Sequence, residues 1–133
     1  MITCADLQNI THARLKDANV LLTNRRYDGA MYLVGYAVEI ALKRRFCQDK
    51  GETSFPSAHT EFEVWRNKHD VWLMTHSLQT LADATTWDCT SSWAEWSVFT
   101  KWAETLRYSP IGYAAPKDTK RMVAAAAVIV GVL

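Results

Sequence analysis

The segment from Ala30 to Cys47 limits what this chain of 133 residues can fold into more than any other stretch. Apolar side chains recur in it at three- and four-residue steps, the period of an α-helix, and period-two alternation is absent. They form two stripes: Ala30, Val34, Ala37 and Ala41 on one side, and Leu33, Tyr36 and Ile40 on another. A helix that is apolar on more than one side packs at the centre of a bundle. We therefore expect this helix to be the most buried of the long helices.

Gly35 lies in the interior of this central helix. Glycine is less favourable than alanine at such a position by about 1 kcal/mol. Its use there indicates a packing reason, since the missing side chain lets a neighbouring element come close. We expect a neighbouring helix to approach the central helix at Gly35.

A first amphipathic helix is predicted ahead of the central one, ending near Asn24. Its apolar face recurs at helical spacing, at Leu7, Thr11, Leu15, Ala18 and Leu22. The residues that follow make a short turn, and Asp28 is well placed there to cap the central helix.

Two capping-box spacings predict further helix starts, Thr60 with Glu63 and Ser92 with Glu95. The second begins a predicted fourth helix that runs to Ser109, just before a proline. Its apolar face consists of Trp96, Phe99, Ala103 and Leu106. A short helix is also predicted within residues 75–84.

The last helix is predicted to begin near Asp118 and is almost entirely apolar from Met122 to Leu133. This apolar run is well short of the ~20 residues needed to span a bilayer, so it predicts a buried helix. The fold class predicted for residues 1–133 is therefore all-α in a single domain. Its architecture is an up-and-down four-helix bundle with one or two short extra helices, and no strand is expected.

The charge balance gives no preference for nucleic acid or anionic membranes, because 15 Lys and Arg residues against 14 Asp and Glu leave a formal net charge of +1. The three cysteines, Cys4, Cys47 and Cys89, are far apart and form no CxxC pair. They predict neither a disulfide framework nor a zinc site. The first residues lack the apolar region of a secretory signal. We expect a cytoplasmic protein with no cofactor and no membrane association.

Four motifs in order along the chain resemble those of HEPN domains. Residues 25–46 read RRYDGAMYLVGYAVEIALKRRF. They are similar to the family's turn with a tyrosine and an aspartate, and to the small-aromatic-Ala-x-Glu-x-x-Leu-Lys run of the helix that follows it. His76-Ser77-Leu78 is similar to the family's His-Asp-Leu, and LRYSP at 106–110 to its Arg-Tyr-Pro. The resemblance covers the chain from about Leu7 onward and implies an HEPN-like bundle.

Many HEPN domains are ribonucleases, often toxins, with an arginine, a polar residue and a histidine four to six positions beyond the arginine. That spacing is absent here. His69 is too close to Arg66 and His76 too far from it, and Tyr113 stands where a histidine beyond Arg107 would be. Tyrosine, with a pKa of ~10, is a poor substitute for histidine, at ~6.5, in proton transfer near neutral pH. We expect binding without cleavage, so the protein is not expected to be an enzyme.

Family members without this motif resemble partners of small nucleotidyltransferases, or binding modules for nucleotides or proteins. The first hypothesis is therefore a non-catalytic HEPN-like binding or regulatory module, the partner of a small nucleotidyltransferase in a toxin–antitoxin or defence system, with a nucleotide or RNA as ligand. The alternative is an HEPN ribonuclease toxin with an atypical active site. A homodimer is expected, because the apolar last helix and six tryptophans leave an apolar patch for a two-fold interface to cover.

The candidate ligand-binding site is a groove between the second and fourth helices. Its predicted residues are Arg107, Tyr108, Glu39, Lys43 and Tyr36. Arg107 either interacts favourably with the dipole at the C-terminal end of the fourth helix or binds a phosphate. Glu39 has apolar neighbours, so it is either a structural polar anchor or part of the site. No catalytic residue is predicted.

Three further features each have a structural and a functional explanation. Lys43, Arg44 and Arg45 form either a solvated helix end or a nucleic-acid patch. The tryptophans either pack in the core or an interface, or stack bases. His69 and His76 share a face only if one helix runs through both, and without a third ligand we expect no metal site.

Overall fold

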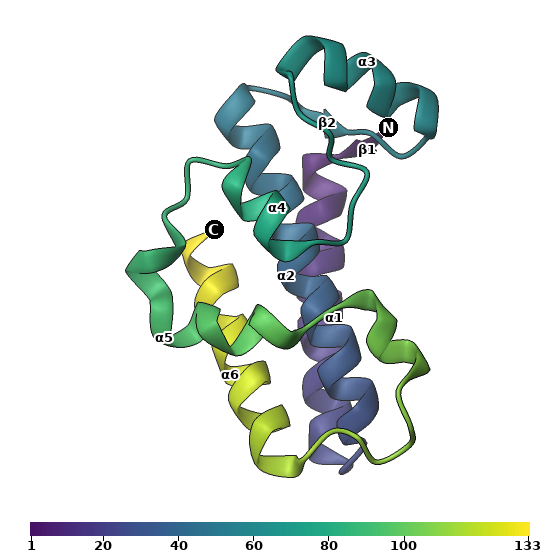
Figure 1. The fold of residues 1–133 in the computed structure, drawn as a ribbon, viewed down its shortest axis with the longest axis vertical. Coiled ribbons are helices and arrows are strands. Elements are labelled where there is room, and N and C mark those ends of the chain that lie inside the picture. Colours follow the sequence, from purple (N-terminus) through teal and green to yellow (C-terminus); the bar gives the residue numbers. More distant parts are fainter.

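The computed structural model describes all residues 1–133 and is 72% helical (Figure 1). Three long helices form its body: α1 (Cys4–Thr23), α2 (Tyr27–Lys50) and α6 (Pro116–Val132). α1 and α2 form an antiparallel pair, and α6 packs against both. The mostly helical fold agrees with the predicted class. None of the helices is both long and apolar enough to cross a membrane.

α2 is the central helix, as its two apolar stripes predict. It contains 11 buried residues, against three in α1 and six in α6. Val34, Val38, Leu42 and Phe46 are almost completely buried. Side chains of this kind stabilise the folded state by about 1.5 to 3 kcal/mol each on burial. The expectation that α2 is the most buried long helix is confirmed.

A small antiparallel sheet, which the sequence pattern did not predict, joins β1 (Ile2–Thr3) to β2 (Ser54–Phe55). Ile2 lies opposite Phe55 in this pairing. Each strand has only two residues, which is too short for period-two alternation to be visible in the sequence. The expectation of no strand is therefore wrong at this one point.

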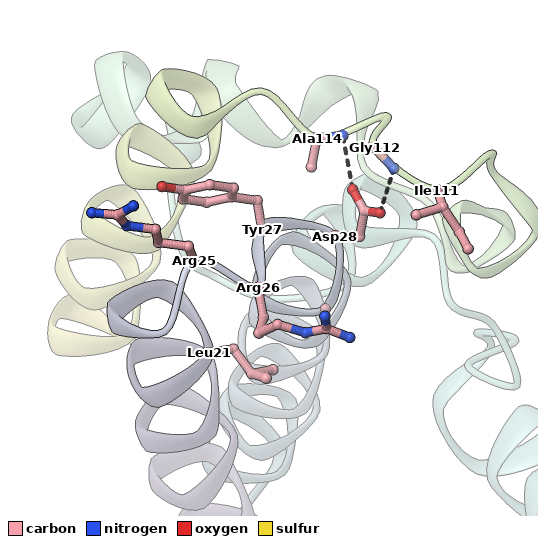
Figure 2. A pocket seen from close by; sticks show the side chains of 9 residues that line it. Leu21, Arg25, Arg26, Tyr27, Asp28, Ile111, Gly112 and Ala114 are labelled. Atoms are coloured by element: carbon pink, nitrogen blue, oxygen red, sulfur yellow. Dashed lines mark hydrogen bonds between the residues drawn. The ribbon is translucent and has the colours of Figure 1, made fainter.

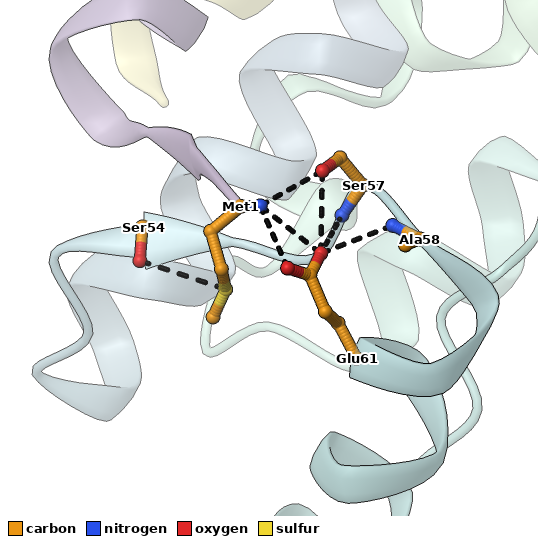
Figure 3. Close-up of polar contacts among 5 residues, drawn as sticks. All are labelled: Met1, Ser54, Ser57, Ala58 and Glu61. Carbon is orange, nitrogen blue, oxygen red and sulfur yellow. Dashed lines mark hydrogen bonds and ion pairs between the residues drawn. The ribbon is translucent and has the colours of Figure 1, made fainter.

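α3 (His59–His69) begins differently from the prediction. The carboxylate of Glu61 accepts hydrogen bonds from the backbone amides of Ser57 and Ala58 and from the ammonium group of Met1 (Figure 3). These donors, the ammonium first, lower the pKa of Glu61 to about 2. The capping box predicted at Thr60 and Glu63 is wrong, because Glu61 bonds these amides instead.

The predicted continuous fourth helix is broken into short pieces. These are the 3₁₀-helix η1 (Cys89–Ser92), α5 (Trp93–Trp96), and the 3₁₀-helices η2 (Ser97–Lys101) and η3 (Glu104–Tyr108). Ser92 makes no side-chain cap. Between η2 and η3 the backbone is extended at Trp102 and Ala103, with ψ of 135° and φ of −150° respectively. The prediction of one helix from Ser92 to Ser109 is therefore wrong.

Trp102 explains this break. A Cβ atom added at Gly35 would lie 1.8 Å from the Trp102 ring, so the indole lies directly on the glycine. The indole nitrogen donates to the carbonyl oxygens of Met31 and Tyr32, at 3.2 and 3.3 Å. A close approach at Gly35 is confirmed, but an indole makes it and not a neighbouring helix.

Asp28 ties the loop before α6 to the start of α2. Its carboxylate accepts hydrogen bonds from the amides of Gly112 and Ala114, at 2.7 and 3.0 Å (Figure 2). The N-cap position of α2 belongs to Arg26, which makes no side-chain cap. The expectation that Asp28 caps α2 is therefore wrong. Its carboxylate instead binds the loop before α6, which is distant in the sequence.

α4 (Leu78–Asp83) is the short helix expected within residues 75–84. The hydroxyl of Ser77 accepts a hydrogen bond from the amide of Thr80 and caps it. This cap fixes the end of the loop 71–77, which carries His76 toward α2.

Candidate functional site

One face of α2 carries four polar side chains in a row. Tyr32, Tyr36, Glu39 and Lys43 follow one another at steps of four, three and four residues, which aligns them along the helix. The two tyrosine hydroxyls lie 3.3 Å apart, and the Lys43 ammonium lies 2.6 Å from Glu39 Oε1. Together with His76 and Arg107, which other segments supply, these side chains form what we name the polar row.

Glu39 is buried, with only 2% of its surface exposed. Besides the Lys43 ammonium, its carboxylate contacts the imidazole of His76, whose Nδ1 lies 3.0 Å from Oε2 and 3.2 Å from Oε1. A buried carboxylate is stable only when it is paired and hydrogen-bonded, and Glu39 meets both conditions. It is therefore a polar anchor that also joins the loop 71–77 to α2.

His76 belongs to the site although it is not among the predicted ligand-binding residues. Its side chain is 49% exposed, and its ring meets that of Tyr36 edge to face. Because Nδ1 faces a carboxylate, we assign its proton to Nδ1, which leaves Nε2 of the neutral ring as a free acceptor. The similarity of His76-Ser77-Leu78 to the HEPN His-Asp-Leu motif is the signal that pointed to this position.

Arg107 adds an unpaired positive charge to the polar row. It lies on η3, is exposed, and has no carboxylate within 4.0 Å. Its guanidinium carbon lies 4.8 Å from the ring centre of Tyr108. The side chain of Tyr108, and then that of Tyr32, raises the pKa of Arg107, so the side chain keeps its charge.

Tyr36 is a hydrogen-bond donor at neutral pH and not a base. Burial, followed by its hydrogen bond with Tyr32, raises the pKa of Tyr36 to about 12. The positive charge of Arg107 acts in the opposite direction and lowers this pKa.

Of the predicted site residues, Tyr36, Glu39 and Lys43 lie on one helix face, and Arg107 lies on η3, which packs against that helix. Tyr108 is 76% exposed and approaches the row only through Arg107. The predicted groove between two long helices is wrong in its form, because η3 and the loop 71–77 occupy the position of the second helix. Tyr32, like His76, is not among the predicted ligand-binding residues, although the i, i+4 spacing of Tyr32 and Tyr36 was available.

His69 is a structural residue on a different part of the molecule. α3 ends at His69, so no single helix carries both His69 and His76. The imidazole Nε2 of His69 lies 3.0 Å from Glu52 Oε1, and its ring packs edge to face against Phe46 and Trp65. No group of three or more His, Cys, Asp or Glu side chains is arranged to hold a metal ion.

The basic triplet on α2 is largely paired. Lys43 contacts Glu39, and Arg45 contacts Asp49 at 2.8 Å and the hydroxyl of Thr86. Burial would raise the pKa of Asp49, but hydrogen bonds from Thr86 and Arg45 outweigh burial and hold this pKa below its ordinary value. The triplet therefore does not present three free charges to a nucleic acid.

The tryptophans divide between core and surface. Trp65, Trp96 and Trp102 are buried, as the packing interpretation expects, whereas Trp72 and Trp93 are 37% and 56% exposed. The ring of Trp72 contacts His59, Phe62 and Arg66, which are not part of the polar row.

Comparisons of this chain with protein-family models, with curated proteins and with solved structures find no match. The HEPN resemblance of the sequence motifs therefore stays a prediction.

Proposed function

We propose that this protein is an HEPN-like binding or regulatory module that holds a phosphate-bearing ligand, a nucleotide or RNA, at the polar row without cleaving it. The observation that carries the proposal is Arg107, an exposed guanidinium with no acidic partner, on η3, which packs against the helix that carries Tyr32 and Tyr36. A guanidinium binds phosphate through two parallel hydrogen bonds, each of about 1.5 to 3 kcal/mol net.

The other members of the row set the charge of the site. Glu39 neutralises Lys43, so Arg107 carries the free positive charge, and the hydroxyl of Tyr36 stays protonated and neutral. His76 lies at the middle of the row, held by Glu39. The row therefore suits one or two phosphate groups more than a long stretch of nucleic-acid backbone.

Titration with a short fluorescently labelled single-stranded RNA, and calorimetry with AMP and ADP, test this proposal. We expect Arg107→Ala to weaken binding about tenfold or more while changing thermal stability little. Arg121→Ala, at another exposed arginine without an acidic partner, is the matched control and should bind as the wild type does. Equal binding by both variants would remove Arg107 from the site and overturn the proposal.

The biological role that we propose is that of a partner of a small nucleotidyltransferase in a toxin–antitoxin or defence system, with the module itself a homodimer. The HEPN resemblance supports the first part. Large apolar side chains left exposed on α5 and α6 support the second, with Trp93 at 56%, Val128 at 45% and Val132 at 49%. Sedimentation should show twice the chain mass of 15.1 kDa at micromolar concentration, and a single 15.1 kDa species contradicts the dimer.

A second candidate function is an RNA-cleaving toxin with an atypical active site, and the contact of Glu39 with His76 favours it. A carboxylate on Nδ1 orients an imidazole and leaves Nε2 free as a general base. In this reaction Nε2 takes the proton of a ribose 2′-hydroxyl as its oxygen bonds to phosphorus. The bond from phosphorus to the 5′-oxygen breaks, and that oxygen takes a proton from water. His76 then returns its proton to the hydroxide.

Incubation of the purified protein with single-stranded RNA separates the two functions. The binding module leaves the RNA intact over hours. Cleavage that is lost in both His76→Ala and Arg107→Ala, with His69→Ala still active, would replace the binding proposal with the ribonuclease.

A further inference from the structure

A cavity of about 300 Å³ has His76 in its lining and lies where the loop 71–77 and α4 face α5, η2 and η3. Its walls are Trp96, Phe99 and Trp102, and its polar lining includes His76, Glu104 and Thr100. Pockets for small ligands begin at about this volume and combine apolar walls with a few polar groups. The cavity therefore has the size and the lining of a site for one small molecule.

The aromatic walls are fixed before any ligand enters. Trp96, Phe99 and Trp102 are all at least 94% buried, since 2%, 3% and 6% of their surfaces are exposed. The indole nitrogen of Trp96 donates to Gln79 Oε1 at 3.2 Å, and that of Trp102 donates to the carbonyl oxygen of Met31. Both indole N–H groups are therefore occupied, so these side chains have no N–H group left to donate to a ligand.

The polar lining contains acceptors without partners. The carboxylate of Glu104 forms neither a salt bridge nor a hydrogen bond in the protein, and Nε2 of His76 is free because Nδ1 contacts Glu39. No lysine or arginine lines the cavity. Carboxylate and imidazole acceptors beside aromatic rings attract positive groups that donate several hydrogen bonds.

We infer that this cavity binds a small organic cation with a planar guanidinium or amidinium head. Glu104 accepts two parallel N–H bonds from the head, and His76 Nε2 accepts another. The apolar side of the cavity contacts the carbon part of the ligand. The inference goes beyond the phosphate-binding proposal and shares only His76 with it, so either can fail alone.

Calorimetric titration with agmatine and with benzamidine tests the inference, with benzamide as the neutral, isosteric control ligand. We expect both cations to bind with one site per chain and benzamide to bind about tenfold more weakly or not at all. Quenching or enhancement of tryptophan fluorescence should accompany binding, because two tryptophans line the cavity. A tetrapeptide with blocked ends that contains arginine is a further probe. If the ligand is a free small cation, as we infer, the tetrapeptide does not bind. Binding of the tetrapeptide would instead indicate a side chain presented by another protein.

Glu104→Gln and Glu95→Gln form the matched pair of variants. Both carboxylates belong to the same segment and are unpaired, but only Glu104 lines this cavity. We expect Glu104→Gln to lower the affinity for benzamidine about tenfold and Glu95→Gln to leave it unchanged. Equal affinities for benzamidine and benzamide, or undiminished binding by Glu104→Gln with an unchanged melting temperature, would overturn the inference.

Discussion

The imidazole Nδ1 of His76 lies 3.0 Å from the carboxylate Oε2 of Glu39, although 37 residues separate them in the sequence. This contact joins the loop 71–77 to α2. It places the half-exposed imidazole of His76 beside the Glu39 side chain, which is 97% buried. Both the phosphate site and the neighbouring cavity depend on the position of His76 that results.

Replacing Glu39 by glutamine tests this anchor. The amide keeps the shape of the side chain but leaves the Lys43 ammonium, whose side chain is 16% exposed, without its counter-charge. Breaking a buried ion pair in this way costs about 3 kcal/mol. We expect urea unfolding to show a loss of that order. Glu63→Gln on the exposed face of α3 should change the free energy of unfolding by less than about 0.5 kcal/mol, and equal effects would rule out the anchor.

Replacing Gly35 by alanine tests the contact that breaks the fourth segment. The added Cβ would meet the Trp102 ring at 1.8 Å, so the indole has to move off α2. Overpacking of a core typically costs about 1 to 3 kcal/mol. Thermal unfolding should show this loss together with a change in tryptophan emission. Gly131→Ala has no atom within 4 Å of its added Cβ and should be neutral or slightly stabilising.

Replacing Asp28 by alanine tests how the loop before α6 is held. The variant leaves the amides of Gly112 and Ala114 without the acceptor that they share. We expect faster hydrogen exchange at these two amides and a loss of about 1 to 3 kcal/mol in stability. Asp28→Asn keeps one acceptor oxygen, so its stability should lie between that of the wild type and that of Asp28→Ala. Unchanged exchange at both amides in Asp28→Ala would contradict the role given to this carboxylate.

The long helices were predictable because their signals are local. The two apolar stripes of α2 and the position of Gly35 are visible within a few helical turns of sequence, and burial follows from them directly. The break at Trp102 was not predictable, because the apolar residues from Trp96 to Leu106 keep helical spacing. Its cause is the packing of the Trp102 indole on Gly35, which is distant in the sequence. His76 is not among the predicted ligand-binding residues for a related reason. A search for an arginine followed at fixed spacing by a histidine cannot detect a loop that folds back onto a helix.

The tyrosine pair of the polar row predicts a loss of stability in alkaline solution. Burial and the hydrogen bond with Tyr32 raise the pKa of Tyr36 from 10.0 to about 12, so the folded protein holds this proton more tightly than the unfolded chain. The stabilisation is therefore fully present below pH 10 and is lost as pH rises toward 12. Urea unfolding across this range should show a steeper loss in the wild type than in Tyr36→Phe, and parallel curves would contradict the shift.

Titration of isotope-labelled protein with AMP, followed by NMR chemical shifts, tests the phosphate site most directly. If the polar row holds the phosphate, the largest shifts occur at the Arg107 guanidinium, the Tyr32 and Tyr36 rings and the His76 imidazole. In Arg107→Ala the shifts of the other three side chains then need about tenfold more AMP or more. Shifts confined to other residues, or no shifts at millimolar AMP, would contradict the account.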